Sequence, residues 1–166
     1  MATPTTLPAT FVSGAVLTAA QQNDLRGAFR VLQVVSGTTF TQTSNSTTTY
    51  ENTTLTQTIT PSSTSSKILV FVTHPNCYKS VANSGNAINM LLFRDATAVL
   101  QATNNVGFTG TALDLYFGIA FSYMDSPAST SAIVYKTQFA NRLNAGLLTV
   151  QQDGVMSQII LMEISA

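Results

Sequence analysis

The stretch that decides the fold lies between Thr54 and Thr73. It starts with the alternating segment Thr54-Leu-Thr-Gln-Thr-Ile-Thr60, passes through Pro61-Ser-Ser-Thr-Ser-Ser66, and ends in the apolar run Lys67-Ile-Leu-Val-Phe-Val-Thr73. Alternation places apolar side chains on one face of a strand and hydroxyl groups on the other, and the Pro/Ser-rich segment is typical of a loop. The apolar run predicts a second strand, which we expect to be buried on both faces.

The chain after residue 38 continues in this manner, with no helical pattern in between. Further strand-like segments, separated by turn signals, lie at residues 87–93, 98–102, 113–124, 132–139, 147–150 and 157–164. A run of about eight short strands favours a mostly β fold. We therefore expect an antiparallel β-sandwich or jelly roll over residues 38–166.

Residues 19–34 show a helical pattern. Thr18 is a good N-cap, Gln21 completes a capping box, and Ser36-Gly37 is a natural stop. Apolar residues repeat at i, i+4 and i+7 on one face of this helix: Leu25, Phe29 and Leu32. This apolar stripe either covers the body of its own domain or packs against copies of itself in a neighbouring chain.

The first 16 residues have the pattern of an extended arm, because Pro4 and Pro8 each fix φ and lack a backbone donor. The arm carries isolated apolar residues: Leu7, Phe11 and Val12. It is either a terminus that touches its own domain or an attachment arm that docks onto a partner. On the second interpretation, residues 1–37 form a region for attachment and assembly.

The charge content excludes several classes of function. The 166 residues include 7 Lys or Arg and 7 Asp or Glu, so the formal net charge is zero and charged residues are 8% of the chain. Too few cations are present to neutralise phosphates, and no apolar run is long enough to span a bilayer, so we expect neither a nucleic acid nor a membrane as partner. Ser and Thr supply about a quarter of the residues, well above their usual share. Their hydroxyl groups solvate a surface without charge repulsion, which suits dense packing beside identical molecules.

Residues that carry catalysis are scarce. The chain has one histidine, His74, and one cysteine, Cys77, which are too few for a zinc site or a disulfide. We expect His74 to lie at a strand end with a local hydrogen bond. Asp95, Asp125 and Asp153 fall in predicted turns, and no nucleophile elbow, phosphate loop or metalloprotease motif occurs. We therefore expect no enzymatic activity, no cofactor and no metal.

Two parts of the chain resemble proteins of virus particles. Within residues 11–29, Leu17-Thr-Ala-Ala20 precedes Asn23-Asp-Leu-Arg26, and this resembles an opening found in many tailed-bacteriophage virion proteins. The segments 59–70, 124–128 and 160–164 are similar to β-sandwich domains of phage fibre and capsid-decorating proteins. They also look like the trimeric jelly rolls of complement globular heads and tumour-necrosis-factor-like proteins. The resemblance implies a trimeric structural protein of the virion and does not separate head from tail.

The function that we expect is that of a capsid-decorating cement or head-fibre protein on the outer surface of the head. We prefer this function to that of a tail fibre because 166 residues leave little room for a fibre shaft. The expected partners are other copies of the chain, as a homotrimer, and the major capsid protein or another virion protein. Closed cyclic symmetry buries an additional apolar face. The aromatic strand residues that we expect near the trimer axis are Tyr116, Tyr135 and Phe139.

The alternative is a tail fibre or tip module that adheres to host-surface glycans. We expect such a module to bind through loops 83–86, 104–110 and 125–131. The tyrosines fit either a sugar-stacking platform or a core and subunit interface.

Overall fold

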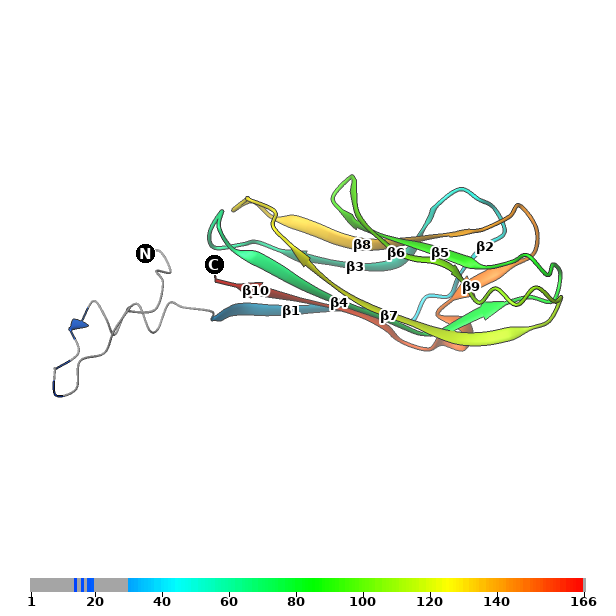
Figure 1. Cartoon of the computed structure of the whole chain (residues 1–166), viewed down its shortest axis with the longest axis horizontal. Coiled ribbons are helices and arrows are strands. Elements are labelled where there is room, and N and C mark those ends of the chain that lie inside the picture. The colour runs from blue at the N-terminus through cyan, green and yellow to red at the C-terminus, as the bar shows by residue number, and fades with distance from the viewer. Residues whose placement is uncertain (1–13, 15, 17, 20–29, 166) are drawn as a thin grey trace.

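The segment around Leu55 forms a strand, and this strand belongs to one of two antiparallel sheets that pack face to face (Figure 1). The computed structural model describes residues 14, 16, 18, 19 and 30–165. Sheet A contains, side by side, β1 (Val31–Thr39), β10 (Ser157–Ile164), β4 (Lys67–Lys79) and β7 (Leu115–Asp125), and β9 (Leu148–Val150) and β2 (Thr43–Asn45) extend it beyond the start of β10. Sheet B contains, in order, β3 (Glu51–Ile59), β8 (Ile133–Asn141), β5 (Ile88–Arg94) and β6 (Thr97–Val106).

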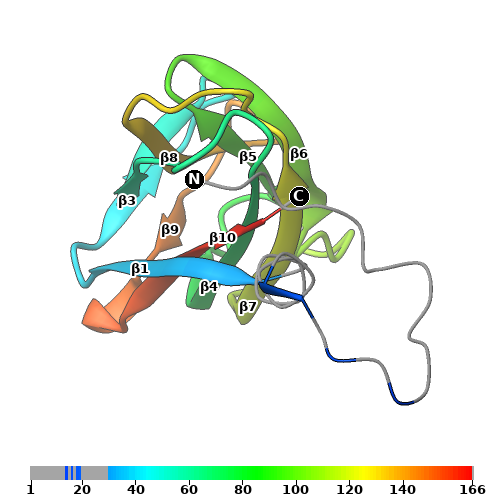
Figure 2. The same cartoon turned by 90° about the vertical axis from the view of Figure 1, so that its left-hand side faces the viewer.

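The sandwich has two ends, which we call the near end and the far end. At the near end, β1 begins and β10 finishes, so that Arg30 and Ser165 lie side by side (Figure 2). The far end carries β9 and β2, together with the end of β4 and the start of β7. From residue 30 to residue 165, the one helical element is the 3-10 turn Gln152–Gly154, which connects β9 to β10.

The core lies between the sheets and consists of two apolar clusters. The cluster toward the near end contains Leu55, Ile59, Ile68, Val70, Val72, Leu92, Ile133, Tyr135, Ile159 and Leu161. The cluster toward the far end contains Cys77, Ile88, Met90, Ile119, Phe139, Leu148 and Val150. Alternate residues of each strand supply these side chains, so the residues between them face outward.

The mostly β, antiparallel sandwich is confirmed, with ten strands where about eight were predicted. The two additional strands are β1 and β2. Residues 31–34 were expected to end a helix, but they are strand, because their valines favour extended backbone and β1 pairs with β10 from Val31 to Thr39. Leu32 therefore lies in β1, at a bulge, and the sandwich begins seven residues before the expected boundary at 38.

The remaining residues of the expected helix and arm, apart from Gly14, Val16, Ala19 and Arg30, lie outside the described residues. They include the positions that were expected to pack or attach: Leu7, Phe11, Val12, Leu25 and Phe29.

Strand β4 differs from its prediction in two ways. It does not stop before His74-Pro75 but continues to Lys79, with a register shift between His74 and Cys77 that accommodates the proline. It is also not buried on both faces, since Phe71 is 40% exposed. An antiparallel sandwich has only one inner face per sheet, so every second residue of an apolar run must point outward.

Candidate functional site

The outer face of sheet A carries a row of apolar side chains across four strands. The registers of β1, β10, β4 and β7 place four residues side by side: Val34, Met162, Leu69 and Met124. In the next row toward the far end, Ile160 and Phe71 are cross-strand neighbours. In the row toward the near end, Val31 pairs with Ile164. We call these eight residues the apolar face.

Four members of the apolar face are largely open to solvent. Val34 is 52% exposed, Val31 49%, Met124 46% and Phe71 40%, and the other four are half-buried. Scattered exposed apolar residues are common on proteins, whereas contiguous ones mark contact surfaces. The apolar face is contiguous over four strands and is therefore the strongest candidate for a functional surface.

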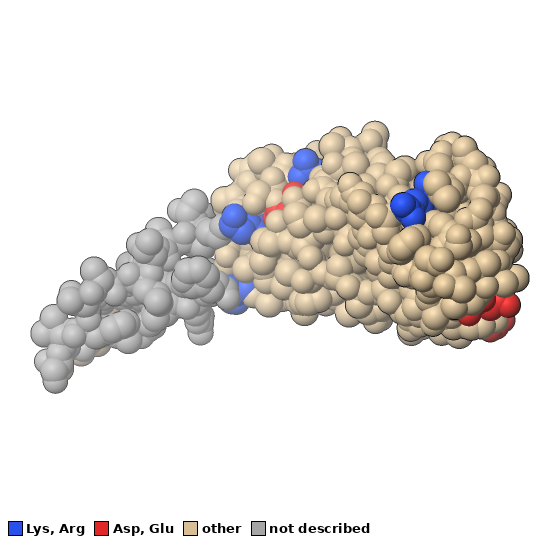
Figure 3. Space-filling model, turned by 45° about the vertical axis from the view of Figure 1, so that its right-hand side comes forward, with Lys and Arg blue, Asp and Glu red and all other residues tan. Residues whose placement is uncertain are grey.

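The outer face of sheet B has a different character. In the described part of the chain, the four strands of sheet B expose no large apolar side chain, whereas the strands of sheet A expose several. Leu91 and Phe93 point outward there but are half-buried, each beside a polar residue of β8. Leu91 pairs with Gln138, and the Lys136 ammonium lies 6.0 Å from the centroid of the Phe93 ring. The outer face of sheet B therefore suits contact with solvent. The molecule as a whole presents few charged side chains in the view of Figure 3.

The point where the chain enters the sandwich is fixed at the rim of the apolar face. The Arg30 amide donates to Ser165 Oγ at 2.8 Å, and the Ser165 amide donates to the Arg30 carbonyl at 2.9 Å. Beside this point, Glu163 is fully buried and accepts hydrogen bonds from the amide and hydroxyl of Ser62, both at 2.7 Å, and from Gln33 at 2.6 Å. Burial acts to raise the pKa of Glu163, but the hydrogen bonds, led by that of the Ser62 hydroxyl, outweigh it and lower the pKa.

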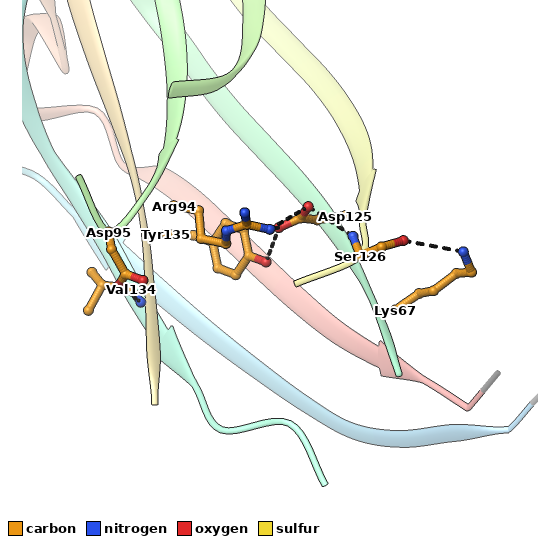
Figure 4. Close-up of polar contacts among 7 residues, drawn as sticks. All are labelled: Lys67, Arg94, Asp95, Asp125, Ser126, Val134 and Tyr135. Atoms are coloured by element: carbon orange, nitrogen blue, oxygen red, sulfur yellow. Dashed lines mark hydrogen bonds and ion pairs between the residues drawn. The ribbon is translucent and has the colours of Figure 1, made fainter. Parts of the chain in front are cut away.

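A buried ionic cluster joins the two sheets at the near end (Figure 4). Asp125, the last residue of β7, accepts two contacts from one guanidinium nitrogen of Arg94 on β5, at 2.9 and 3.0 Å. It also accepts the Tyr135 hydroxyl at 2.6 Å and the Ser126 amide at 2.8 Å. Burial and then the hydrogen bond to Asp125 raise the pKa of Tyr135. Asp125 thus acts as a link between sheets, where only a turn residue was expected.

A second buried polar cluster, around His74, joins the sheets farther along. His74 is fully buried within β4, and its Nε2 lies 3.2 Å from the hydroxyl of Thr137 on β8. Its Nδ1 lies 2.9 Å from Ser157 Oγ and 2.9 Å from the Gln151 side-chain oxygen. With its side-chain oxygen placed beside His74, Gln151 donates from its amide nitrogen to the carbonyl of Thr53 at 3.1 Å. We call these residues the histidine cluster.

The histidine cluster corrects the expectation of a strand-end histidine with a local hydrogen bond. Its partners Thr137 and Ser157 come from elements distant in sequence, because β4 runs through the middle of sheet A. Burial lowers the pKa of His74 to about 4 and raises that of the nearby Cys77 thiol to about 12. Both groups are therefore neutral near pH 7, and neither is exposed to a substrate.

The far end presents a pair of tyrosine rings. Tyr78 on β4 and Tyr116 on β7 face outward with ring centroids 5.0 Å apart, and Tyr116 is 56% exposed. Asp114 accepts the Tyr78 hydroxyl at 2.6 Å and the Val81 amide at 2.8 Å. The hydrogen bond to Asp114 raises the pKa of Tyr78 to about 12, with smaller contributions from burial and charge.

Two cations also lie at the far end. The Arg142 guanidinium is 4.7 Å from the centroid of the Phe108 ring, and that ring is half exposed. Lys79 is fully buried and donates to the hydroxyl of Thr109, and its burial lowers its pKa. Apart from the tyrosine pair on β4 and β7, the exposed apolar and aromatic side chains of this end belong to separate loops, so they form a less continuous surface than the apolar face.

The residues that were predicted for a trimer axis are not brought together. Tyr135 and Phe139 are fully buried in the core, where they cannot touch another copy, so this expectation was wrong for both. They lie on the same side of β8 as Ile133, and that side faces sheet A. Tyr116 is exposed, but it lies at the far end and away from the apolar face.

The three loops that were expected to bind glycans are split between the two ends. Loops 83–86 and 104–110 lie near the far end, next to Ile88 and Val106. Loop 125–131 starts at Asp125, which pairs with Ile68 at the near end. These loops cannot form one binding surface on a single copy.

The apolar face itself was missed, although a signal for it was present. The runs around Leu69 and around Met162 are continuously apolar. In an antiparallel sandwich such a run must expose half of its side chains, so two adjacent runs indicate an apolar outer face. Which run lies beside which follows from the register, and the register comes only from the structure.

The described part of the chain contains no cluster of metal-ligating side chains and no membrane-spanning helix. Its His, Cys, Asp and Glu side chains form no group of three or more that could hold a metal ion. None of its helical segments is long and apolar enough to cross a membrane.

Comparison with solved structures gives a structural likeness, whereas comparison by sequence gives no match. No family model matches the chain, and no curated protein matches it. Among solved structures, the chain is similar to the VP2 subviral particle of infectious bursal disease virus, with 14% sequence identity and a TM-score of 0.42. The match covers 82% of this chain and 38% of that one, so this chain spans well under half the length of the protein that it matches.

Proposed function

We propose that this chain is a structural protein of a virus particle that works by binding and has no bond-making activity. In this proposal it is a cement or head-fibre protein that assembles as a homotrimer on the outer surface of the head. Its other partner is the major capsid protein or another virion protein, and it binds neither nucleic acid nor membrane. The sequence resemblance to phage virion proteins supports the class of protein.

The observation that carries this proposal is the difference between the two outer faces. The apolar face of sheet A leaves Val34 and Met124 about half exposed, whereas sheet B presents mostly polar side chains around Gln138 and Lys136. A protein that works alone in solution gains nothing from such a face, because exposed apolar area lowers solubility. A protein that is buried among copies of itself gains stability from it.

The charge distribution supports the same proposal. Only 8% of the residues are charged, and among the described residues the one ion pair, Arg94 with Asp125, is largely buried. The surface is therefore nearly neutral and hydroxyl-rich. Copies of such a protein can lie at high local density without electrostatic repulsion.

Binding to the assembled shell would stabilise it by mass action, because a ligand that binds only the lattice shifts the equilibrium toward the lattice. The test uses capsids isolated without this protein. Incubated with the purified chain and sedimented, they should bind it to a fixed ratio of copies per capsid protein and should withstand higher temperature. Absence of saturable binding to capsids would overturn the cement proposal.

One observation favours the second candidate, a tip module that binds host-surface glycans. The exposed Tyr116 ring beside Tyr78 and the Asp114 carboxylate resembles a platform for stacking a sugar. Labelled protein should then bind host cells and not capsids, and Tyr116→Ala should remove that binding. Phe40→Ala is the control, because Phe40 is an exposed aromatic residue outside the tyrosine pair and the three expected loops.

A further inference from the structure

We propose that the apolar face of each copy is covered by residues 19–29 of a neighbouring copy. This inference rests on the self-assembly in the proposed function and names the surface and the segment that would hold the copies together. Three properties of the described residues support it: where the segment begins, how large the face is, and what the single chain leaves uncovered.

The segment begins at the rim of the face. Two hydrogen bonds join Arg30 to Ser165, one from the Arg30 amide and one to the Arg30 carbonyl. The next residue, Val31, belongs to the apolar face and pairs with Ile164. The described chain therefore enters the sandwich beside this surface and not at the far end. Every copy in an oligomer presents the segment and the face at the same end.

The dimensions of the face match the segment. The four strands from β1 to β7 are separated by three spacings of about 4.8 Å, so the row from Val34 to Met124 is about 14 Å across. Residues 19–29 as a helix would be about 16 Å long. Their apolar positions, Leu25 and Phe29, are four residues apart and so share one helix face. One such helix would cover the row.

The size of the face argues against two faces simply pressed together. Eight side chains, of which four are about half exposed, leave a patch of roughly a few hundred Å². A stable interface needs about 800 Å² from each partner. The patch alone is too small for a face-to-face dimer, whereas a heterologous contact buries both the face and the segment of every copy.

The exposure of the described residues favours a contact between copies over a contact within one chain. Val16 is 91% exposed and Arg30 is exposed, so described residues on both sides of the segment lie open to solvent. The apolar face is open in the same chain. When the segment of one copy fits the face of the next, the contact is heterologous, and it closes into a ring if the rotation between copies allows.

The first experiment measures native mass at micromolar concentration by light scattering. The full chain should form a closed oligomer, and Leu69→Glu in the middle of the apolar face should reduce its mass about threefold, to the 17.6 kDa of one chain. Leu91→Glu is the matched control, because Leu91 is also a half-buried leucine on the outer face of a central strand, in sheet B. It should leave the oligomer intact. A deletion of residues 2–29 should act as Leu69→Glu does.

The second experiment locates the segment without depending on the stability of a charged variant. Leu25→Cys and Met124→Cys are combined in one chain, and Cys77 needs no replacement because it is fully buried. Oxidation should link different chains and give a ladder that ends at the size of the oligomer on a non-reducing gel. A cross-link confined within single chains, or no cross-link, would overturn the proposal.

The two proposals fail in distinguishable ways. If the full chain is a monomer, self-assembly in the proposed function is wrong. If the full chain is an oligomer that survives both Leu69→Glu and the deletion, the copies meet elsewhere and only this inference is wrong.

Discussion

Two polar clusters lie buried between the same two sheets, and they differ in charge. The ionic cluster holds Asp125 of sheet A against Arg94 and Tyr135 of sheet B. The histidine cluster holds His74 of sheet A against Thr137 of sheet B with neutral groups alone. Both fix how one sheet sits on the other, which apolar side chains do less specifically. The ionic cluster is stable only when each partner is present, because a lost partner leaves a charge unpaired. The histidine cluster is stable only while His74 stays unprotonated.

The ionic cluster should show the larger effect of a single deletion. Asp125→Ala leaves the Arg94 guanidinium, 28% exposed, and the buried Tyr135 hydroxyl without their acceptor. Breaking a buried pair by removing one partner costs about 3–5 kcal/mol, and the partial exposure of Arg94 places this case at the lower end, about 3–4 kcal/mol. The free energy of unfolding in urea measures this loss.

Glu51→Ala is the control for that substitution, since Glu51 is an exposed carboxylate at the start of β3. It should change the free energy of unfolding by less than about 1 kcal/mol. A loss below about 1 kcal/mol for Asp125→Ala as well would show that the ionic cluster does not hold the sheets together.

The histidine cluster should make stability depend on pH. Burial lowers the pKa of His74 from 6.5 to about 4, so below pH 6.5 the unfolded chain binds a proton that the folded chain does not. The free energy of unfolding should therefore fall as the pH drops from 6.5 to 4, by about 3 kcal/mol in all, and this contribution should level off below pH 4. Urea unfolding at half-unit steps of pH measures it.

His74→Asn is the variant that isolates this effect. It should be less stable than the parent chain at pH 7 but should lose most of the slope between pH 6.5 and 4.5. The lower limit avoids Glu163, whose lowered pKa makes its contribution disappear only as the pH falls below its ordinary value of 4.5. An unchanged slope in the variant would assign the pH dependence to another group.

Local sequence was enough to predict the strands but not how they meet. The alternation from Thr54 to Thr60 and the apolar run from Lys67 predicted the existence of β3 and β4, but not that β4 continues past Pro75 or exposes one of its faces. In residues 31–34, however, an apparent helical spacing lost to pairing with β10, which lies about 130 residues away in the sequence. A local pattern carries no information about such a partner.

The candidate surface was harder to predict for the same reason. On β8, Tyr135, Thr137 and Phe139 alternate with Lys136 and Gln138, which already indicates that Tyr135 and Phe139 face the core. The apolar face needed more than this, because it exists only when the registers place Leu69 between Met162 and Met124. The partners of His74 likewise come from strands that meet it only in the folded sandwich.

The smallest expected effect tests whether the neutral cluster holds the sheets at all. Thr137→Val keeps the size of the side chain but removes the hydroxyl that contacts His74 Nε2 at 3.2 Å and the Thr53 hydroxyl on β3. Unpaired neutral groups cost less than an unpaired charge, so the free energy of unfolding should fall by about 1–2 kcal/mol. Thr58→Val, an exposed hydroxyl on the outer face of the same sheet, should change it by less than about 0.5 kcal/mol. If the two variants are equally stable, the Thr137 hydroxyl does not help to hold the sheets together, and Ser157 and Gln151 are the partners that hold His74.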